Sequence, residues 1–172
     1  MPHRDEVDRL VAAWREQRPD LDVSPLEVFS RVSRLAKHLE RHRRAAFAAS
    51  DLSVPEFDVL AALRRMGAPY QLSPKSLLRR TLVSSGTMTN RIDRLHARGL
   101  VERHSDPSDR RGVLVRLTPL GLERVDAAIG RFVEAERQLL AELSEDEQTQ
   151  LATLLRTITV SFDNQLDDEV ES

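Results

Sequence analysis

The stretch Ser84-Ser-Gly-Thr-Met-Thr-Asn-Arg-Ile-Asp-Arg-Leu95 decides the fold, because its apolar residues recur at helical spacing among polar ones. Met88, Ile92 and Leu95 follow one another at i, i+4 and i+7, which predicts one inward stripe on an amphipathic helix. Gly99 comes soon after the last of them and is expected to end this helix. The polar and cationic residues between them should then face away from the core.

A second, shorter helix is predicted just before this one. Ser73-Pro74 supplies an N-cap and a proline at the first helical position, and the helix should end near Thr81. The three residues Thr81-Leu-Val83 then turn the chain into the helix that begins at Ser84. Two short helices joined by such a turn predict a helix-turn-helix, whose second helix enters the major groove of DNA.

After Gly99 the sequence predicts a β-hairpin. The runs Leu100–Ser105 and Gly112–Thr118 are rich in β-branched residues, and the turn-forming cluster Asp106-Pro-Ser-Asp-Arg-Arg111 joins them. A hairpin directly after a helix-turn-helix predicts a wing with a charged tip, from which an arginine can enter the minor groove. The alternative is an ordinary surface turn with compensating charges.

The predicted DNA contacts come from the outward side of the second helix and from the hairpin tip. Small polar and cationic groups on the helix can bond base edges and phosphates, and backbone amides at its start can meet a phosphate. Asp109 lies two residues before Arg111 and can orient it through a carboxylate–guanidinium pair. The full predicted set is Ser84, Ser85, Thr87, Thr89, Asn90, Arg91, Arg94, Asp109, Arg110 and Arg111.

The charge of the chain is divided along its length, although the net charge is only −2. Residues 75–116 carry ten Lys and Arg against four Asp and Glu, whereas residues 119–172 carry four against thirteen. This division favours one face that meets a polyanion and another that stays solvated or meets a partner. Chance clustering is the alternative interpretation.

The fold class predicted from these patterns is mainly α with a small β-hairpin wing, in a single domain over residues 1–172. Its parts are an extra N-terminal helix (5–18), dimerisation helices (24–49 and 119–163) and the winged helix-turn-helix (53–118). The apolar stripes of the outer helices exceed what one small module can cover, so a homodimer is expected. Such a dimer should read a pseudo-palindromic operator in double-stranded DNA, with half-sites about one helical turn apart.

Several helix starts are predicted from capping boxes, in which a serine is followed three residues later by glutamate. The boxes begin at Ser24 and Ser53, and Ser144-Glu-Asp-Glu147 is expected to begin the last helix. The acidic tail from about Asn164 is expected to be frayed.

The motifs also resemble those of a known family. The chain carries, in this order, Leu72-Ser-Pro74, Ser84–Leu95, Gly99-Leu-Val-Glu-Arg103 and Asp106–Pro119. In sequence and spacing these stretches resemble the core of the MarR regulators, and the resemblance covers nearly the whole chain. It implies a dimer in which the N- and C-terminal helices of two chains interlock, and it assigns the wing arginine, here Arg111, to the minor groove.

The helix before Ser24 is an extension that many MarR proteins lack. Its segment Val11–Val23 resembles the subgroup that responds to urate and, more closely, to trans-aconitate and related tricarboxylates. The resemblance implies release from DNA by a small anionic effector such as trans-aconitate, citrate or a urate-like compound. It implies the ligand-binding residues Trp14, Asp58, Arg91 and Arg103.

The chemistry of these four residues fits an anion. Trp14 offers a rigid face, and the two arginines offer bidentate binding of carboxylates. If Asp58 pairs with Arg91, a ligand that competes for Arg91 would shift the recognition helix. The alternatives are that Trp14 only anchors the extension in the core, that Asp58–Arg91 is a structural ion pair, and that Arg103 contacts a DNA phosphate.

Several classes of function are excluded or disfavoured. The chain has no cysteine, so it has neither disulfides nor thiolate metal sites. The start, Met1-Pro-His-Arg-Asp-Glu6, lacks the layout of a secretory signal, and no stretch approaches the roughly 18 apolar residues of a membrane span, so the protein is expected to be cytoplasmic. His38 and His42 lie at i, i+4, but their basic neighbours favour a solvated face over a metal site.

No catalytic motif or phosphate loop is found, so neither an enzyme nor a cofactor is expected. The sequence therefore predicts a sequence-specific transcriptional regulator, a repressor, whose ligand releases it from DNA. The alternative is an architectural DNA-binding protein without a ligand response.

Overall fold

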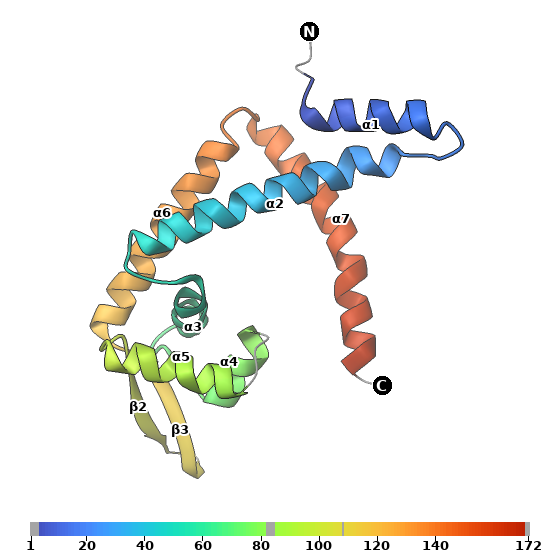
Figure 1. The fold of residues 1–172 in the computed structure, drawn as a ribbon. Helices are drawn as coiled ribbons and strands as arrows, with labels where there is room; N and C mark the ends of the chain where they lie inside the picture. The colour runs from blue at the N-terminus through green and yellow to red at the C-terminus, as the bar shows by residue number, and fades with distance from the viewer. Residues whose placement is uncertain (1–3, 82–84, 108, 171–172) are drawn as a thin grey trace. The chain divides into compact units, whose positions relative to one another are not determined.

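The chain folds mainly into helices, with one small antiparallel sheet (Figure 1). The structure, a computed structural model, describes residues 4–81, 85–107 and 109–170, without the side chains of residues 110, 111 and 161–170. Two compact units, Met1–Phe132 and Val133–Ser172, are described separately. The predicted fold class is confirmed. The elements are α1 (Glu6–Gln17), α2 (Ser24–Ala48), α3 (Val54–Arg64), β1 (Gln71–Leu72), α4 (Pro74–Thr81), α5 (Ser85–Ala97), β2 (Val101–Asp106), β3 (Asp109–Leu117), α6 (Pro119–Leu139) and α7 (Glu145–Val170).

The core of the first unit forms where α3, α4 and α5 pack together. Leu63 of α3 and Leu77 of α4 are fully buried. The predicted inward stripe of α5 is confirmed, since Met88, Ile92 and Leu95 are at most 1% exposed. Because three side chains on one face are buried, the rotation of α5 about its axis is fixed.

The sheet has the order β1-β3-β2, with β3 paired antiparallel to both neighbours. In β1, Gln71 lies opposite Arg116, whose guanidinium donates to Gln71 Oε1 at 2.7 and 3.0 Å. The sequence did not predict this strand, because two residues are too few to show an alternating pattern.

The strands of the hairpin continue closer to its tip than the sequence predicted. Asp106 pairs with Asp109, so only residues 107 and 108 lie between β2 and β3. Arg110 and Arg111 therefore belong to strand β3, and their predicted place on the turn is wrong. Turn-forming residue types suggested a six-residue loop, but Asp106 belongs to β2, and Asp109, Arg110 and Arg111 belong to β3.

A bulge near the tip explains why glycine occupies position 112. The pairing shifts between Ser105, which lies opposite Val113, and Asp106, which lies opposite Asp109. A Cβ atom on Gly112 would lie 2.8 Å from the Cβ of Asp106 and 3.1 Å from the carbonyl oxygen of Asp109. The bulge can close only around a residue without a side chain.

The capping box predicted at Ser53 is confirmed, and so is the predicted start of the last helix at Ser144. At the start of α3, the backbone N–H of Ser53 donates to Glu56 Oε2 at 2.8 Å, and the reciprocal serine cap is present. At the start of α7, the backbone N–H of Ser144 donates to Glu147 Oε2 at 2.8 Å. These bonds satisfy helix-terminal amides that would otherwise have no partner.

The box predicted at Ser24 is wrong. Val23 is the N-cap residue of α2 without a side-chain cap, and Ser24 is already helical. The backbone N–H of Ser24 instead donates to Asp22 Oδ1 at 3.0 Å. Glu27 is occupied by an ion pair with Arg15 at 2.5 Å, which links α1 to α2.

The N-terminal extension α1 packs on the start of α2 through a small apolar cluster. Val7, Val11 and Val23 are buried together, with Leu26 packed against them. Trp14 does not join this cluster, since it is 47% exposed. The interpretation that Trp14 anchors the extension in the core of its own chain is therefore wrong.

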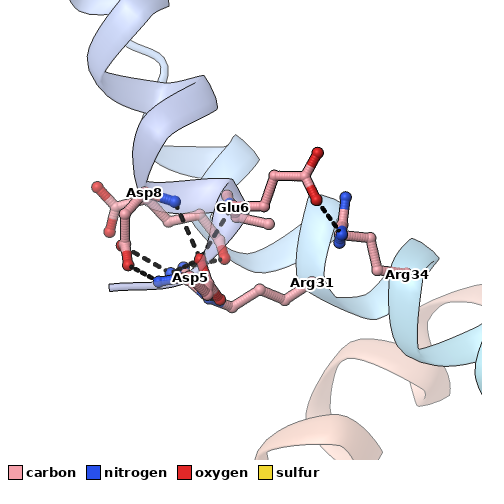
Figure 2. A network of polar contacts seen from close by, with 7 residues as sticks. Asp5, Glu6, Asp8, Arg31 and Arg34 are labelled. Carbon is pink, nitrogen blue, oxygen red and sulfur yellow. Dashed lines mark hydrogen bonds and ion pairs between the residues drawn. The ribbon is translucent and has the colours of Figure 1, made fainter. Parts of the chain in front are cut away.

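Ion pairs complete the contact between α1 and α2 (Figure 2). Arg31 of α2 donates to Asp5 at 2.9 Å and to Asp8 at 2.7 Å, and Arg34 pairs with Glu6. The Arg31 guanidinium and the Asp8 amide hold the pKa of Asp5 below its usual value. These charges are exposed to solvent, so the ion pairs add little to the stability of the fold. Their main effect is to orient α1 on α2.

The outer helices carry apolar stripes that the single chain leaves open. On α2, Phe29 is 50% and Leu35 is 47% exposed, and on α7, Leu154 is 57% exposed.

The backbone of α7 is helical to Val170, so the frayed tail predicted from Asn164 is wrong for the backbone. Within the residues that the structure describes, no helix is long and apolar enough to cross a membrane.

The start of α6 lies in close contact with the loop before β2. Thr118 caps the helix, since its hydroxyl accepts from the N–H of Gly121 at 3.0 Å and donates to the carbonyl of Gly99 at 2.7 Å. A Cβ atom on Gly121 would lie 1.9 Å from the carbonyl oxygen of Leu100. This contact admits only glycine.

Candidate nucleic-acid interface

The outward face of α5 carries most of the predicted DNA contacts on that helix. Arg91 is half-buried at the edge of this face, and Ser84 lies outside the described residues. The Thr89 hydroxyl donates to the carbonyl of Ser85 at 3.1 Å, so in this structure it is bonded within the helix. The exposed members of the predicted set on α5 are Ser85, Thr87, Thr89, Asn90 and Arg94.

The wing places the backbone of its two arginines in strand β3 (Figure 1). Asp109 is exposed at the start of this strand. The side chains of Arg110 and Arg111 lie outside the described part of the chain, and with them the predicted Asp109–Arg111 pair. What the structure provides is a hairpin whose last pair is Asp106 with Asp109, with the backbone of both arginines following in β3.

An ion pair joins the wing to the recognition helix. Arg103 of β2 donates to Asp93 of α5 at 2.5 Å, and both side chains are about half exposed (40% and 51%). Arg103 was expected at a ligand or at a DNA phosphate, whereas here its charge is used to tie β2 to α5. A competing carboxylate can reach this pair from solvent.

Asp58 does not pair with Arg91 in the described residues, so that prediction is wrong. Its carboxylate accepts instead from Arg43 of α2 at 2.5 Å. The Arg43 guanidinium also lies over the Phe47 ring, 5.6 Å from its centroid, and the Phe47 ring stacks on Phe57 at 3.7 Å. This packing holds Arg43 beside α3, and the pair links α2, rather than α5, to α3.

Trp14 lines a surface groove that is formed by residues of α1 alone. This groove has a volume of about 600 Å³ and is formed by Trp14 with Glu6, Arg9, Leu10, Ala13 and Gln17. Asp58, Arg91 and Arg103 are not among its lining residues. The single chain does not gather the four residues around this groove.

Sequence reasoning missed the two partner residues, Arg43 and Asp93. Arg43 lies four residues before Phe47, so the helical period places both on the same side of α2 and gave a usable signal. Asp93 had no such signal, because it lies between Ile92 and Arg94 on the recognition helix, where a carboxylate is unexpected beside DNA.

The basic residues in the middle of α2 form a separate surface groove. It has a volume of about 730 Å³, and an Arg41 guanidinium nitrogen lies 2.7 Å from His38 Nδ1. Among the residues that the structure describes, no three His, Asp or Glu side chains are grouped so that they could hold a metal ion. The groove is lined by Arg34, Ala36, Lys37, His38, Glu40, Arg41 and Arg44.

Comparisons of the sequence find the same type of protein. Residues 50–112, from the end of α2 to the wing, match a model of the MarR family. The chain is 40% identical over 150 residues to the HTH-type transcriptional regulator PecS of Dickeya dadantii, which covers 87% of this chain and 90% of that protein. The similarity therefore includes the flanking helices as well as the winged module.

Comparisons with solved structures find the same family. A mutant of Escherichia coli MarR complexed with operator DNA has a TM-score of 0.63 and 26% identity, covering 84% of this chain and 96% of that one. BpsR of Bordetella bronchiseptica, solved to explain the regulation of its DNA binding by 6-hydroxynicotinic acid, has a TM-score of 0.56 and 30% identity, covering 75% and 98%. With its winged helix-turn-helix between long outer helices, this chain belongs to the MarR family of DNA-binding transcriptional regulators.

Proposed function

We propose that the protein is a repressor that binds a pseudo-palindromic operator as a homodimer and is released by a small anionic ligand. The observation that carries the proposal is the polar, cationic outer face of α5, fixed in rotation by three buried residues and followed by an arginine-bearing hairpin. A helix presented in this way matches the geometry by which such regulators read the major groove. The operator complex of the related MarR supports the same mode of binding.

In this proposal a second copy covers the open stripes of the outer helices. Phe29, Val32 and Leu35 of α2 lie at helical spacing and are each 40% or more exposed. Large apolar side chains grouped in this way are rare on a monomer surface and are typical of an interface. A twofold dimer then presents two recognition helices about 34–36 Å apart.

The DNA contacts of each protomer are proposed to come from α5 and the wing. Asn90 and Arg94 are exposed on α5 and suited to base edges and phosphates. Arg111 is proposed to enter the minor groove, with Arg110 at the adjacent phosphates. Arg91 is placed at the edge of the contact, because it is half-buried.

The ligand is proposed to be a small acid such as trans-aconitate, citrate or a urate-like compound. Support comes from the exposed Arg103–Asp93 pair, in which a free carboxylate can replace the aspartate and so loosen α5 from the wing. Asp58, Arg91 and Trp14 complete the proposed ligand set in the dimer. A ligand of this kind acts only to the extent that it binds the DNA-free form more tightly.

The salt dependence of DNA binding tests the proposal. Arg91, Arg94 and Arg110 of two protomers would release counterions from about six phosphates, so log affinity should fall against log salt with a slope of about −5. Fluorescence anisotropy with a duplex selected from random DNA by the protein itself would measure this slope. A slope shallower than about −2 would contradict the proposed interface.

Trp14 provides the readout for the ligand, since it is the single tryptophan and is half exposed. Addition of trans-aconitate or citrate at millimolar concentration should shift its emission and release the labelled duplex in the same range, because the ring is proposed to contact the acid. Sodium chloride at equal ionic strength is the control. If trans-aconitate, citrate and urate all leave emission and DNA binding unchanged, the proposed ligand response is contradicted.

A further inference from the structure

The residue that follows α5, Arg98, reaches across the first unit to the loop between α2 and α3. Its Nη1 donates to Glu56 Oε1 at 2.8 Å. Its Nη2 donates to the carbonyl oxygen of Asp51 at 2.5 Å and to Asp51 Oδ2 at 2.7 Å. One guanidinium thus joins the end of the recognition helix to both sides of this loop.

The same loop receives two arginines from α6. Arg131 Nη1 donates to the hydroxyl of Ser50 at 2.6 Å, and Arg124 Nη1 lies 3.4 Å from the Ser50 carbonyl oxygen. Ser50 is only 3% exposed, so these contacts are largely shielded from water. We call the segment from Ser50 to Glu56 the junction. It follows α2 and contains the start of α3, and it accepts hydrogen bonds from Arg98 after α5 and from Arg131 of α6.

The junction is locally well defined. Asp51 has a positive φ of 56°, which turns the chain sharply after α2. The side chain of Glu56 is 14% exposed. Burial alone would raise its pKa, but hydrogen bonds from Ser53 and Arg98 outweigh burial and hold the pKa below the usual value. Glu56 is therefore charged at neutral pH and able to hold Arg98 in a fixed direction.

The buried contacts of α5 with the core are apolar, and apolar contacts have little directional preference. The exposed Arg103–Asp93 pair ties α5 to β2 and not to α2. Met88, Ile92 and Leu95 fix which face of α5 is buried, but they do not by themselves fix its angle to α2. The guanidinium of Arg98 does so, because it bonds Asp51 in the turn that follows α2 and Glu56 in the first turn of α3. α2 carries the open stripe proposed for the dimer, so this angle determines where each recognition helix lies in a dimer.

We propose that Arg98 is a positioning residue that sets the distance between the two recognition helices, and with it the half-site spacing that the dimer accepts. This inference rests on the proposed dimeric mode of DNA binding. Arg98 itself is not proposed to touch DNA.

The test compares the wild-type protein with Arg98→Met. This substitution keeps an unbranched apolar side chain and removes the guanidinium group that bonds Asp51 and Glu56. The probes are a duplex selected from random DNA by the wild type and copies with the half-sites moved one or two base pairs closer or farther. Wild type should lose about tenfold or more in affinity at each altered spacing. Arg98→Met should lose about tenfold on the selected spacing and show a flattened profile, with the salt slope unchanged because no phosphate contact is lost.

Arg64→Met is the matched control, because Arg64 forms a comparable pair with Asp126 of α6 at 2.8 Å but does not bond the junction. It should keep the wild-type spacing profile. If Arg98→Met weakens binding by the same factor at every spacing, the inference is overturned. If wild type itself shows no spacing preference, the proposed dimeric binding fails instead.

Circular dichroism shows whether Arg98→Met is folded. If it is not, Asp51→Asn replaces it, because Asp51 is 77% exposed and asparagine tolerates the positive φ. Asp51→Asn weakens only one side of the fork, so it should flatten the profile partly. An unchanged profile in this variant would overturn the inference as well.

Discussion

Replacing Arg111 by alanine should lower the affinity for the selected duplex at least about 100-fold while the fold is retained. A charge-assisted contact contributes about 1.5–3 kcal/mol, and a dimer loses it at both half-sites. Titration of labelled duplex at fixed salt measures the loss. The proposed contact lies in the minor groove, so Arg111→Lys should recover only part of the affinity, because lysine keeps the charge without the planar fork.

Arg9→Ala is the matched control for this change, since Arg9 is an exposed arginine of α1 outside the proposed contact. It removes the same charge and should leave affinity within about twofold of wild type. Wild-type affinity in a folded Arg111→Ala protein would remove the wing from the proposed mechanism.

Replacing Gly121 by alanine should destabilise the protein by about 3 kcal/mol or more. The new methyl group would lie 1.9 Å from the carbonyl oxygen of Leu100, which is backbone and cannot turn aside. The start of α6 would have to move, and the Thr118 cap would be disturbed with it. A thermal scan should show Tm lowered by about 6–12 °C.

Gly130 offers the control within the same helix. A Cβ atom there meets nothing within 4 Å, so Gly130→Ala should stabilise the protein by about 0.5–1 kcal/mol through helix propensity. Equal Tm changes in the two variants would show that the close contact at Gly121 does not exist in solution.

The sequence predicted the parts of the fold that depend on local patterns. The period of Met88, Ile92 and Leu95 located the buried face of α5, and Ser73-Pro74 located the start of α4. The capping box at Ser53 was predictable because its bonds join residues three apart. In each case the decisive pattern lies within about two helical turns.

The parts that were missed depend on residues far apart in the chain. β1 forms through antiparallel pairing with β3, in which Gln71 lies opposite Arg116, 45 residues away. Arginines on several elements could pair with Asp58 as far as the sequence shows. The tertiary packing of Arg43 over Phe47 determines that Arg43 is the partner. Arg98 contacts Asp51 across 47 residues, and nothing in the local pattern distinguishes it from a solvated arginine.

The extension of the hairpin strands changes what association with DNA costs. Fixing the backbone of one residue costs about 1–2 kcal/mol in conformational entropy. Arg110 and Arg111 lie in strand β3, between the paired residues Asp109 and Val113, so their backbone is held on both sides and part of that loss has already occurred when the protein folds. The wing is thus preorganised, and the arginines have mainly their side-chain rotamers left to order when the duplex arrives.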